Sequence, residues 1–314
     1  MPILRLNAGP TGLTLNGSPG SVRSAIGSGL RSPAVGRGPV IILIHGCKYD
    51  PASPAFSPHG RIFAMQARRS SMTCWPGALG FGAGDPDEGL AIAFGWPARG
   101  HLWRALRSAH VAGLQLGRVI NDLKAIAPQR PVHVVTHSMG SEVILSALHA
   151  LPAGAVQRIV TLSAASYVSC AVNALQTPAG RAAELFNITS RENDLFDSLY
   201  ERLIAPPEHG DGAMGRGLNL ANAVNIELDC PQTLAALRMF GAQIAPARRR
   251  VCHWSSYTRP GALPFYARAL RRPHSVPLPV LRDALPLNPT PRWTRMLARP
   301  RFSFALPMPH KTAS

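Results

Sequence analysis

Short apolar runs alternate along the chain with longer segments in which apolar residues recur at helical spacing. The run Val40–Ile44 contains no polar residue, which is typical of a strand buried on both faces of a parallel sheet. Residues 103–127 carry apolar side chains at close to helical spacing, and Pro128 ends this predicted helix. A second helix is predicted over residues 141–151. The predicted strands are Val40–Ile44, Leu90–Phe94, Val132–Thr136, Arg158–Leu162, Glu184–Thr189 and Val224–Leu228.

This alternation predicts an α/β fold with a mostly parallel central sheet and helices on both faces. A chain of 314 residues is long enough for one sizeable core. We therefore expect one domain over residues 1–270, with a loop-rich entry at 16–39 and a candidate lid region at 206–250, followed by a proline-rich tail at 271–314. No apolar run reaches the roughly 18 residues of a membrane-spanning helix. Glycine and proline interrupt residues 1–15, so a signal peptide is not expected either.

Cysteine use and charge refine this prediction. The five cysteines are odd in number, widely spaced and without a C-x-x-C pair, which is typical of free thiols in a cytoplasmic protein.

The formal net charge is +17, and residues 231–314 hold 14 basic residues and one acidic residue. A region this basic is able to contact nucleic acid or an anionic membrane, although a solvated surface is the simpler interpretation. We expect at most a weak contact of the tail with an anionic surface and no specific nucleic-acid partner, and the oligomeric state stays open.

The strongest chemical signal is the segment Thr136–Gly140, T-H-S-M-G, between a predicted buried strand and a predicted helix. A serine at such a turn presents its hydroxyl at the carboxyl edge of the sheet, and the crowded turn needs small residues two positions away on either side. Gly140 meets this need, whereas Thr136 stands where glycine is usual. The helix behind Ser138 directs free N–H groups toward a developing oxyanion. The alternative interpretation is that Ser138 only caps this helix.

Residues 94–100 read F-G-W-P-A-R-G, and the strand at 40–44 runs into a His-Gly pair. These two motifs resemble a poorly characterised bacterial branch of the α/β-hydrolase superfamily, which has an F-S-W-P-S-R-G segment. The branch has the same order of motifs and a H-S-M-G nucleophile elbow, and the resemblance covers residues 40–194. It implies an α/β-hydrolase fold and a serine triad, but no substrate. It also implies that the backbone N–H groups of Cys47 and Met139 form the oxyanion hole.

In this fold the acid and the histidine of the triad follow the serine along the chain. Asp194 comes just after the predicted strand Glu184–Thr189, where the fold presents its acid, and is our choice for that role. Glu192 and Asp197 are close enough in sequence to be alternatives for the acid, although Asp197 fits better as part of the helix that is predicted to begin at this point.

His253 is our choice for the base. Apolar and aromatic residues flank it and can exclude water, and residues 262–270 can form a final packing helix behind it. One feature departs from the usual pattern, because a helical stretch at 232–240 separates His253 from the last predicted strand. A structural histidine bonded to a backbone carbonyl is the alternative. The other histidines after Asp194 are His209, in a loop of low complexity, and His274 and His310, in the proline-rich tail.

Together these residues predict a serine hydrolase that acts on a small-molecule acyl substrate. His253 would take the proton of Ser138 as the serine attacks a carbonyl, Asp194 would hold the imidazole, and an acyl-enzyme would form. A carboxylic ester is the expected substrate, while amides, thioesters and acyl transfer to an alcohol stay open. The alternative is a non-catalytic α/β-hydrolase scaffold that binds a partner or an anionic surface through its basic C-terminal region.

No cofactor or metal ion is expected. Residues 80–84 look like a dinucleotide-binding loop, but they neither follow a buried strand nor open a helix. The phosphate-binding pattern G-x-x-x-x-G-K-[ST] does not occur in the sequence. His133 and His137 are four residues apart on a predicted strand, whereas the zinc-protease motif needs this spacing on a helix.

Overall fold

The computed structural model describes residues 2–66, 73–287 and 290–297. Its centre is an eight-stranded sheet with the order β2-β1-β4-β3-β5-β6-β7-β8, in which β1 and β2 pair antiparallel and the other neighbours pair parallel. All six predicted strands are present, each within one residue of its expected bounds. The strands are β1 (Ile3–Gly9), β2 (Gly12–Leu15), β3 (Val40–Ile44), β4 (Leu90–Gly95), β5 (Val132–His137), β6 (Arg158–Leu162), β7 (Glu184–Thr189) and β8 (Ala223–Glu227).

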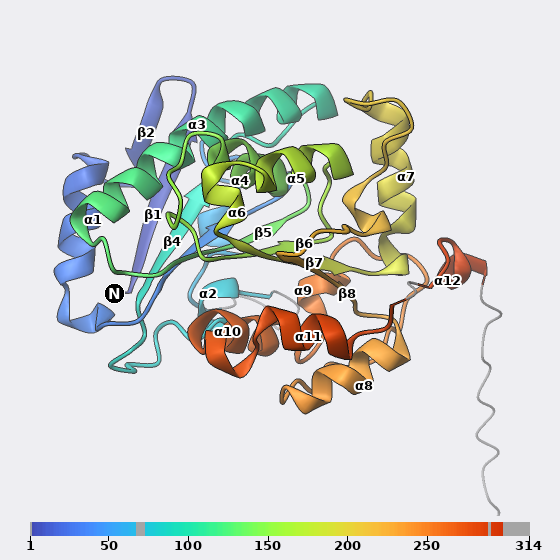
Figure 1. The fold of residues 1–314 in the computed structure, drawn as a ribbon. Helices are drawn as coiled ribbons and strands as arrows, with labels where there is room; N and C mark the ends of the chain where they lie inside the picture. Colours follow the sequence, from blue (N-terminus) through green and yellow to red (C-terminus); the bar gives the residue numbers. More distant parts are fainter. Residues whose placement is uncertain (1, 67–72, 288–289, 298–314) are drawn as a thin grey trace, which may run out of the picture.

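Helices cover both faces of the sheet (Figure 1). Ile42 and Ile44 of β3 pack into one apolar cluster, and Ile41 and Leu43 pack into another on the opposite face. The sheet is therefore buried on both sides, as its unbroken apolar strands predicted. The first cluster takes in α1 (Val22–Arg31), α3 (Leu102–Ile126), α4 (Gly140–Leu148), α5 (Val168–Leu175) and α6 (Pro178–Arg181). The second takes in α2 (Trp75–Ala78), α8 (Pro231–Met239), α9 (Ser255–Thr258), α10 (Ala262–Arg271) and α11 (Leu278–Ala284).

The strand register places several loops side by side at the carboxyl edge of the sheet. Ile44 of β3 pairs with Phe94 of β4 on one side and with Thr136 of β5 on the other. The loops that follow these three strands therefore start next to one another. After β7, the 3₁₀ turn η3 (Arg191–Asn193) leads into α7 (Asp194–Leu203) at the same edge.

Three segments that the sequence predicted as irregular or lid-like carry regular structure. The entry at 16–39 contains α1, whose first turn is capped by Ser21, and η1 (Pro33–Val35). The candidate lid at 206–250 supplies η4 (Met214–Arg216), β8 and α8. The described part of the tail forms η5 (Pro273–Ser275), α11 and α12 (Thr294–Leu297). Its buried apolar side chains, which pack into the second apolar cluster, are Val276, Leu278, Leu281 and Leu285.

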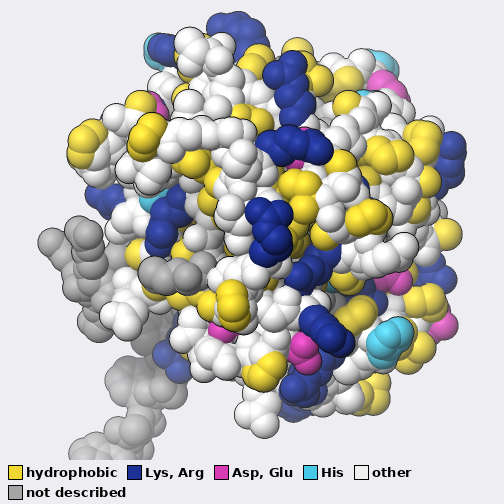
Figure 2. All heavy atoms as spheres, turned by 90° about the vertical axis from the view of Figure 1, so that its left-hand side faces the viewer, with side chains coloured by type: hydrophobic (Ala, Val, Ile, Leu, Met, Phe, Trp, Pro, Cys, Tyr) yellow, Lys and Arg dark blue, Asp and Glu magenta, His cyan; other side chains and the backbone are white. Residues whose placement is uncertain are grey.

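Basic side chains are numerous on one face of the molecule. Figure 2 shows Lys and Arg side chains scattered among apolar and uncharged groups on the face beside α1, where acidic side chains are fewer. Among the described residues, no helix combines the length and the apolar character that a membrane crossing requires.

Candidate active site

Ser138 lies in a strained turn between β5 and α4. Its φ of 53° is in the left-handed region, and its N–H donates to the carbonyl oxygen of Leu162 at 3.0 Å. The turn is crowded, because a Cβ atom at Gly46 would lie 2.6 Å from Cβ of Ser138. A Cβ at Gly140 would likewise lie 2.5 Å from the carbonyl oxygen of His45. A glycine is thus required two residues after the serine, and Thr136 fits two residues before it.

The structure brings His253 to this serine. Nε2 of His253 lies 2.9 Å from Oγ of Ser138, so the histidine is in place to accept the serine proton. The loop that carries His253 is held from both sides. The N–H of Cys252 donates to the carbonyl oxygen of Glu192 at 2.8 Å, and Nε2 of His137 donates to the carbonyl oxygen of His253 at 3.1 Å. The helix α8 lies between the last strand and this loop, which is a departure from the usual pattern of the fold. His253 nevertheless reaches Ser138.

Asn193 occupies the position expected of the acid. Its Oδ1 lies 2.6 Å from Nδ1 of His253, and its Nδ2 donates to Oδ1 of Asp197 at 2.9 Å. Because the carboxyl oxygen of Asp197 accepts, the NH₂ group of Asn193 faces it and the amide oxygen faces the histidine. The proton of the neutral imidazole is then on Nδ1, which leaves the lone pair of Nε2 directed at Ser138.

The sequence choice of Asp194 needs correction. Oδ2 of Asp194 accepts from the backbone N–H of Trp293 at 2.6 Å and makes no hydrogen bond to His253 in the described residues. The cause is local geometry. Asn193 ends η3 and Asp194 begins α7, and consecutive residues of a helix point about 100° apart, so only one of them can face the histidine.

The two competing carboxylates also lie elsewhere. Glu192 is buried in an ion pair with Arg259, and it accepts from the N–H of Arg249 at 3.1 Å. Asp197 lies behind Asn193, one hydrogen bond further from the histidine. Only carboxylates were expected in this role from the sequence. The signal that could have found Asn193 is its place at the start of a helix immediately after β7.

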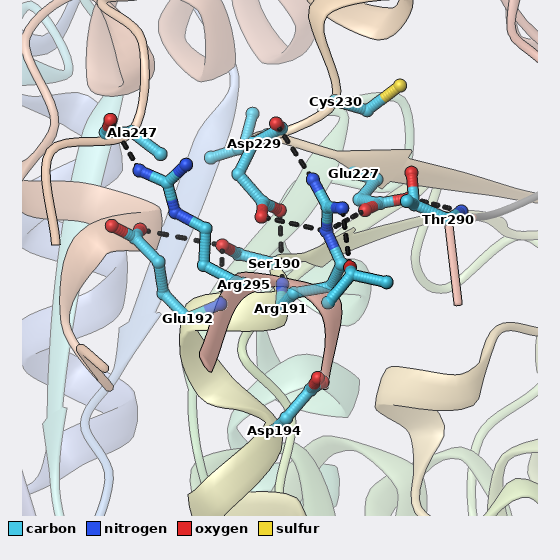
Figure 3. A network of polar contacts seen from close by, with 12 residues as sticks. Ser190, Arg191, Glu192, Asp194, Glu227, Asp229, Cys230, Ala247, Thr290 and Arg295 are labelled. Carbon is cyan, nitrogen blue, oxygen red and sulfur yellow. Dashed lines mark hydrogen bonds and ion pairs between the residues drawn. The ribbon is translucent and has the colours of Figure 1, made fainter. Parts of the chain in front are cut away.

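A network of ion pairs holds the turn that carries Asn193 (Figure 3). Nε of Arg191 lies 2.9 Å from Oδ2 of Asp229 and 2.8 Å from Oε1 of Glu227. Its Nη1 donates to Oγ1 of Thr294 at 2.7 Å, and the N–H of Thr290 donates to Glu227 at 3.1 Å. The C-terminal segment 290–297 is therefore tied to η3 and β8, next to the proposed site.

The candidate oxyanion-hole residues also lie at this edge. Met139 directly precedes α4, and Cys47 follows His45-Gly46, with Sγ of Cys47 3.8 Å from Sδ of Met139. Neither backbone N–H donates to the backbone of another residue within residues 2–66, 73–287 and 290–297. Burial raises the pKa of the Cys47 thiol to about 11, so this side chain is uncharged at neutral pH. The arrangement leaves two backbone donors beside Ser138.

Trp96 fixes the conformation of the His45 loop. Its backbone N–H donates to Nε2 of His45 at 3.0 Å, its indole N–H donates to the carbonyl oxygen of His45 at 2.8 Å, and the two rings stack at 5.5 Å. Nδ1 of His45 donates to the carbonyl oxygen of Gly46 at 2.8 Å. Burial lowers the pKa of His45 to about 3, which keeps the ring neutral. The F-G-W-P segment thus supports the strand-to-loop connection that precedes Cys47.

The surroundings of His253 favour its neutral form. Burial is the main cause that lowers its pKa well below the ordinary value, and the neighbouring His137 and the positive charge of Lys48 act in the same direction. Phe196 stacks on the imidazole with ring centroids 4.6 Å apart. A neutral imidazole at neutral pH is the form that accepts a proton. The described residues contain no cluster of three or more His, Cys, Asp or Glu able to hold a metal ion.

Residues 26–172 match a family model described as "Alpha/beta hydrolase of unknown function (DUF900)". The matched range contains Cys47, the segment 94–100 and Ser138, and it ends before Asn193 and His253. The chain has the α/β-hydrolase fold, with a mostly parallel eight-stranded sheet and helices on both faces, and the match supports a hydrolase. A search of curated proteins found no match.

Proposed function

We propose that this protein is a serine hydrolase that cleaves a carboxylic ester, or a related acyl bond, through Ser138, His253 and Asn193. The observation that carries the proposal is the contact between Nε2 of His253 and Oγ of Ser138, at 2.9 Å. It lies at a strand-to-helix turn with strained backbone, where nucleophiles of this fold stand.

The reaction would proceed in two halves. Oγ of Ser138 attacks the substrate carbonyl carbon while Nε2 of His253 takes the hydroxyl proton. The N–H groups of Cys47 and Met139 then hold the oxyanion, with support from the start of α4. Collapse of the tetrahedral intermediate releases the alcohol, which receives the proton from His253, and leaves the acyl group on Ser138. A water molecule activated by the same histidine releases the acid.

Asn193 would orient the imidazole without adding a charge. Its amide oxygen accepts from Nδ1 of His253 and stabilises the imidazolium through a dipole, where a carboxylate would supply a full negative charge. A neutral partner should therefore stabilise the imidazolium less than an aspartate does. The cysteine proteases with a Cys-His-Asn arrangement use an amide in the same position.

A fluorophosphonate probe tests the proposal directly. The folded protein should be labelled on Ser138, and it should hydrolyse p-nitrophenyl acetate or butyrate. Ser138→Ala should abolish both reactions, with an unchanged circular dichroism spectrum and Tm, because loss of a nucleophile typically costs several orders of magnitude in kcat. A folded protein that stays unlabelled and inactive would instead support the non-catalytic scaffold.

A further inference from the structure

Lys48 combines an unusual backbone conformation with a place directly after the candidate oxyanion donor Cys47. Its φ is 80°, in the left-handed region that residues with a side chain rarely adopt. The conformation is held by two hydrogen bonds between the loops after β3 and β4. The N–H of Lys48 donates to the carbonyl oxygen of Ala98 at 3.1 Å, and the N–H of Ala98 donates to that of Tyr49 at 2.9 Å. Strain kept in place by its surroundings is common at functional sites.

The Lys48 side chain extends from the loop that carries Cys47 toward the loop that carries His253. Its Nζ lies 5.2 Å from the centroid of the Trp254 ring, and Trp254 directly follows His253. The positive charge is felt at the imidazole, since Lys48 contributes to the lowered pKa of His253. The ammonium group therefore lies close to the residue that follows His253, on the side chain of the residue that follows Cys47.

Within the described residues, no Asp or Glu forms an ion pair with this charge. Lys48 is exposed, and within the described residues no carboxylate lies within 4.0 Å of its ammonium group. The ranges outside the described residues, 67–72, 288–289 and 298–314, contain no Asp or Glu. The nearest acid along the chain, Asp50, accepts from the N–H of Ala52 at 3.0 Å.

A second cation without a carboxylate partner lies next to Lys48. Arg99 directly follows Ala98, is exposed, and stacks its guanidinium on the ring of Phe56 at 3.5 Å. It too has no carboxylate within 4.0 Å in the described residues. The loops after β3 and β4 therefore each carry an exposed cation that pairs with no carboxylate among the described residues.

We propose that Lys48 selects acyl substrates that carry a carboxylate or a similar anionic group close to the scissile carbonyl. The inference rests on the proposed serine hydrolase activity and names the substrate class of the same site. An anionic group next to the ester would pair with the Lys48 ammonium, while the ester carbonyl binds the adjacent N–H groups of Cys47 and Met139. Because Lys48 is exposed, the pairing should weaken at high salt.

Two matched ester pairs test the inference. On the acyl side, monoethyl succinate is compared with neutral diethyl succinate, with ethanol as the measured product. On the leaving-group side, 4-acetoxybenzoate is compared with its neutral methyl ester. Lys48→Asn removes the charge with a residue that tolerates left-handed backbone, and Lys48→Gly does so with no side chain at all. Arg118→Gln, an exposed position on α3, is the control for loss of a surface cation.

For at least one pair, Lys48→Asn and Lys48→Gly should lower kcat/KM for the anionic ester about ten-fold more than for the neutral ester. Lys48→Arg should keep most of the preference, Arg118→Gln should keep all of it, and 0.5 M NaCl should reduce it in the unmodified protein. Where turnover is too slow to measure, the anionic and the neutral ester are compared by how strongly each slows labelling of Ser138 by the fluorophosphonate probe.

Two outcomes overturn the inference and leave the proposed function intact. In one, both Lys48 variants lower kcat/KM equally for the charged and neutral esters, so that Lys48 acts on the histidine and not on the substrate. In the other, the variants change kcat/KM for neither the anionic nor the neutral ester. A folded protein whose Ser138 resists the probe would overturn the proposed function itself, and the substrate preference with it.

Discussion

The side-chain oxygen of Asn193 lies 2.6 Å from Nδ1 of His253, in the place where a carboxylate oxygen was expected. The carboxyl group of Asp197 is one hydrogen bond further away, where it accepts from Nδ2 of Asn193. The histidine is therefore oriented by a neutral amide with a carboxyl group behind it. This arrangement decides which residues should matter for turnover.

Asn193→Ala should lower kcat of the proposed hydrolase by about 10- to 100-fold. The variant loses a hydrogen bond to an imidazole that becomes charged during the reaction, and such bonds contribute about 1.5–3 kcal/mol. Asp194→Asn is the matched control, because its amide oxygen can still accept from Trp293, and kcat should stay within about three-fold of the unmodified value. Initial rates on p-nitrophenyl acetate measure both. A severe loss in Asp194→Asn with a mild effect of Asn193→Ala would restore Asp194 as the orienting acid.

Asp197 should make the stability of the fold depend on pH. Burial is the main cause that raises its pKa to about 8; Asp194 and Glu201 also raise it, while Arg292 and Arg216 lower it. The folded state then binds the Asp197 proton more tightly than the unfolded state does. The stabilising contribution is fully present below the ordinary carboxyl pKa of about 4, and it is lost as pH rises through about 8.

The test is the Tm of Asp197→Asn against that of the unmodified protein from pH 4 to pH 9. The asparagine oxygen can still accept from Asn193, so activity near pH 7 should be largely kept. The difference in Tm, variant minus unmodified protein, should grow as pH rises toward 8 and level off above it. A difference that stays constant across this range would show that Asp197 ionises normally in the folded protein.

Trp96→Phe should reduce both stability and kcat. The substitution removes the indole N–H that donates to the buried carbonyl oxygen of His45 at 2.8 Å, and an unsatisfied buried carbonyl costs about 1–3 kcal/mol. The His45 loop also positions Cys47, so kcat should fall more than KM rises. Trp103→Phe is the matched control, because Trp103 is 52% exposed and donates to Leu203 at the surface. Equal effects of the two substitutions on kcat would contradict the role of Trp96.

Most of the sheet was predictable because its strands are apolar on both faces. β3 stands out as an unbroken apolar run and β5 as a run of β-branched residues interrupted by His133, and the turn after β5 has the small residue that its crowding demands. β1 and β2 were not predicted, since these strands at the edge of the sheet are only partly buried and show no such run. α1 lies in a segment rich in Gly and Ser, and it is helical because Ile26 and Leu30, four residues apart, pack into the core.

The candidate site was predictable where it depends on sequence motifs and less so where it depends on helix phase. Ser138 follows from the strand-turn-helix pattern, and His253 follows from elimination among the later histidines. Choosing between Asn193 and Asp194 requires the residue at which α7 begins. Sequence patterns locate helix ends only to within a few residues, whereas a shift of one residue turns a side chain by about 100°.

A chain that ends after Leu270 should fail to reach the native state, although the sequence alone predicts one domain over residues 1–270 with a tail behind it. Val276, Leu278 and Leu281 are at most 2% exposed, and losing each removes about 1.5–3 kcal/mol of apolar burial. The truncation also removes Arg292 and Trp293, whose contacts with Glu201 and Asp194 support the start of α7.

The comparison chain ends after Leu297, which keeps every described residue of the C-terminal region. It should match the full-length protein in Tm and in hydrolysis of a small soluble ester. Thermal unfolding followed by circular dichroism measures the Tm. Initial rates on p-nitrophenyl acetate, together with labelling of Ser138, measure the activity. A soluble, labelled protein ending at Leu270 would show that α11 and the segment 290–297 only cover a domain that is complete without them. Because Thr294 and Trp293 contact the turn that carries Asn193 and Asp194, we instead expect the proposed active site to depend on this segment.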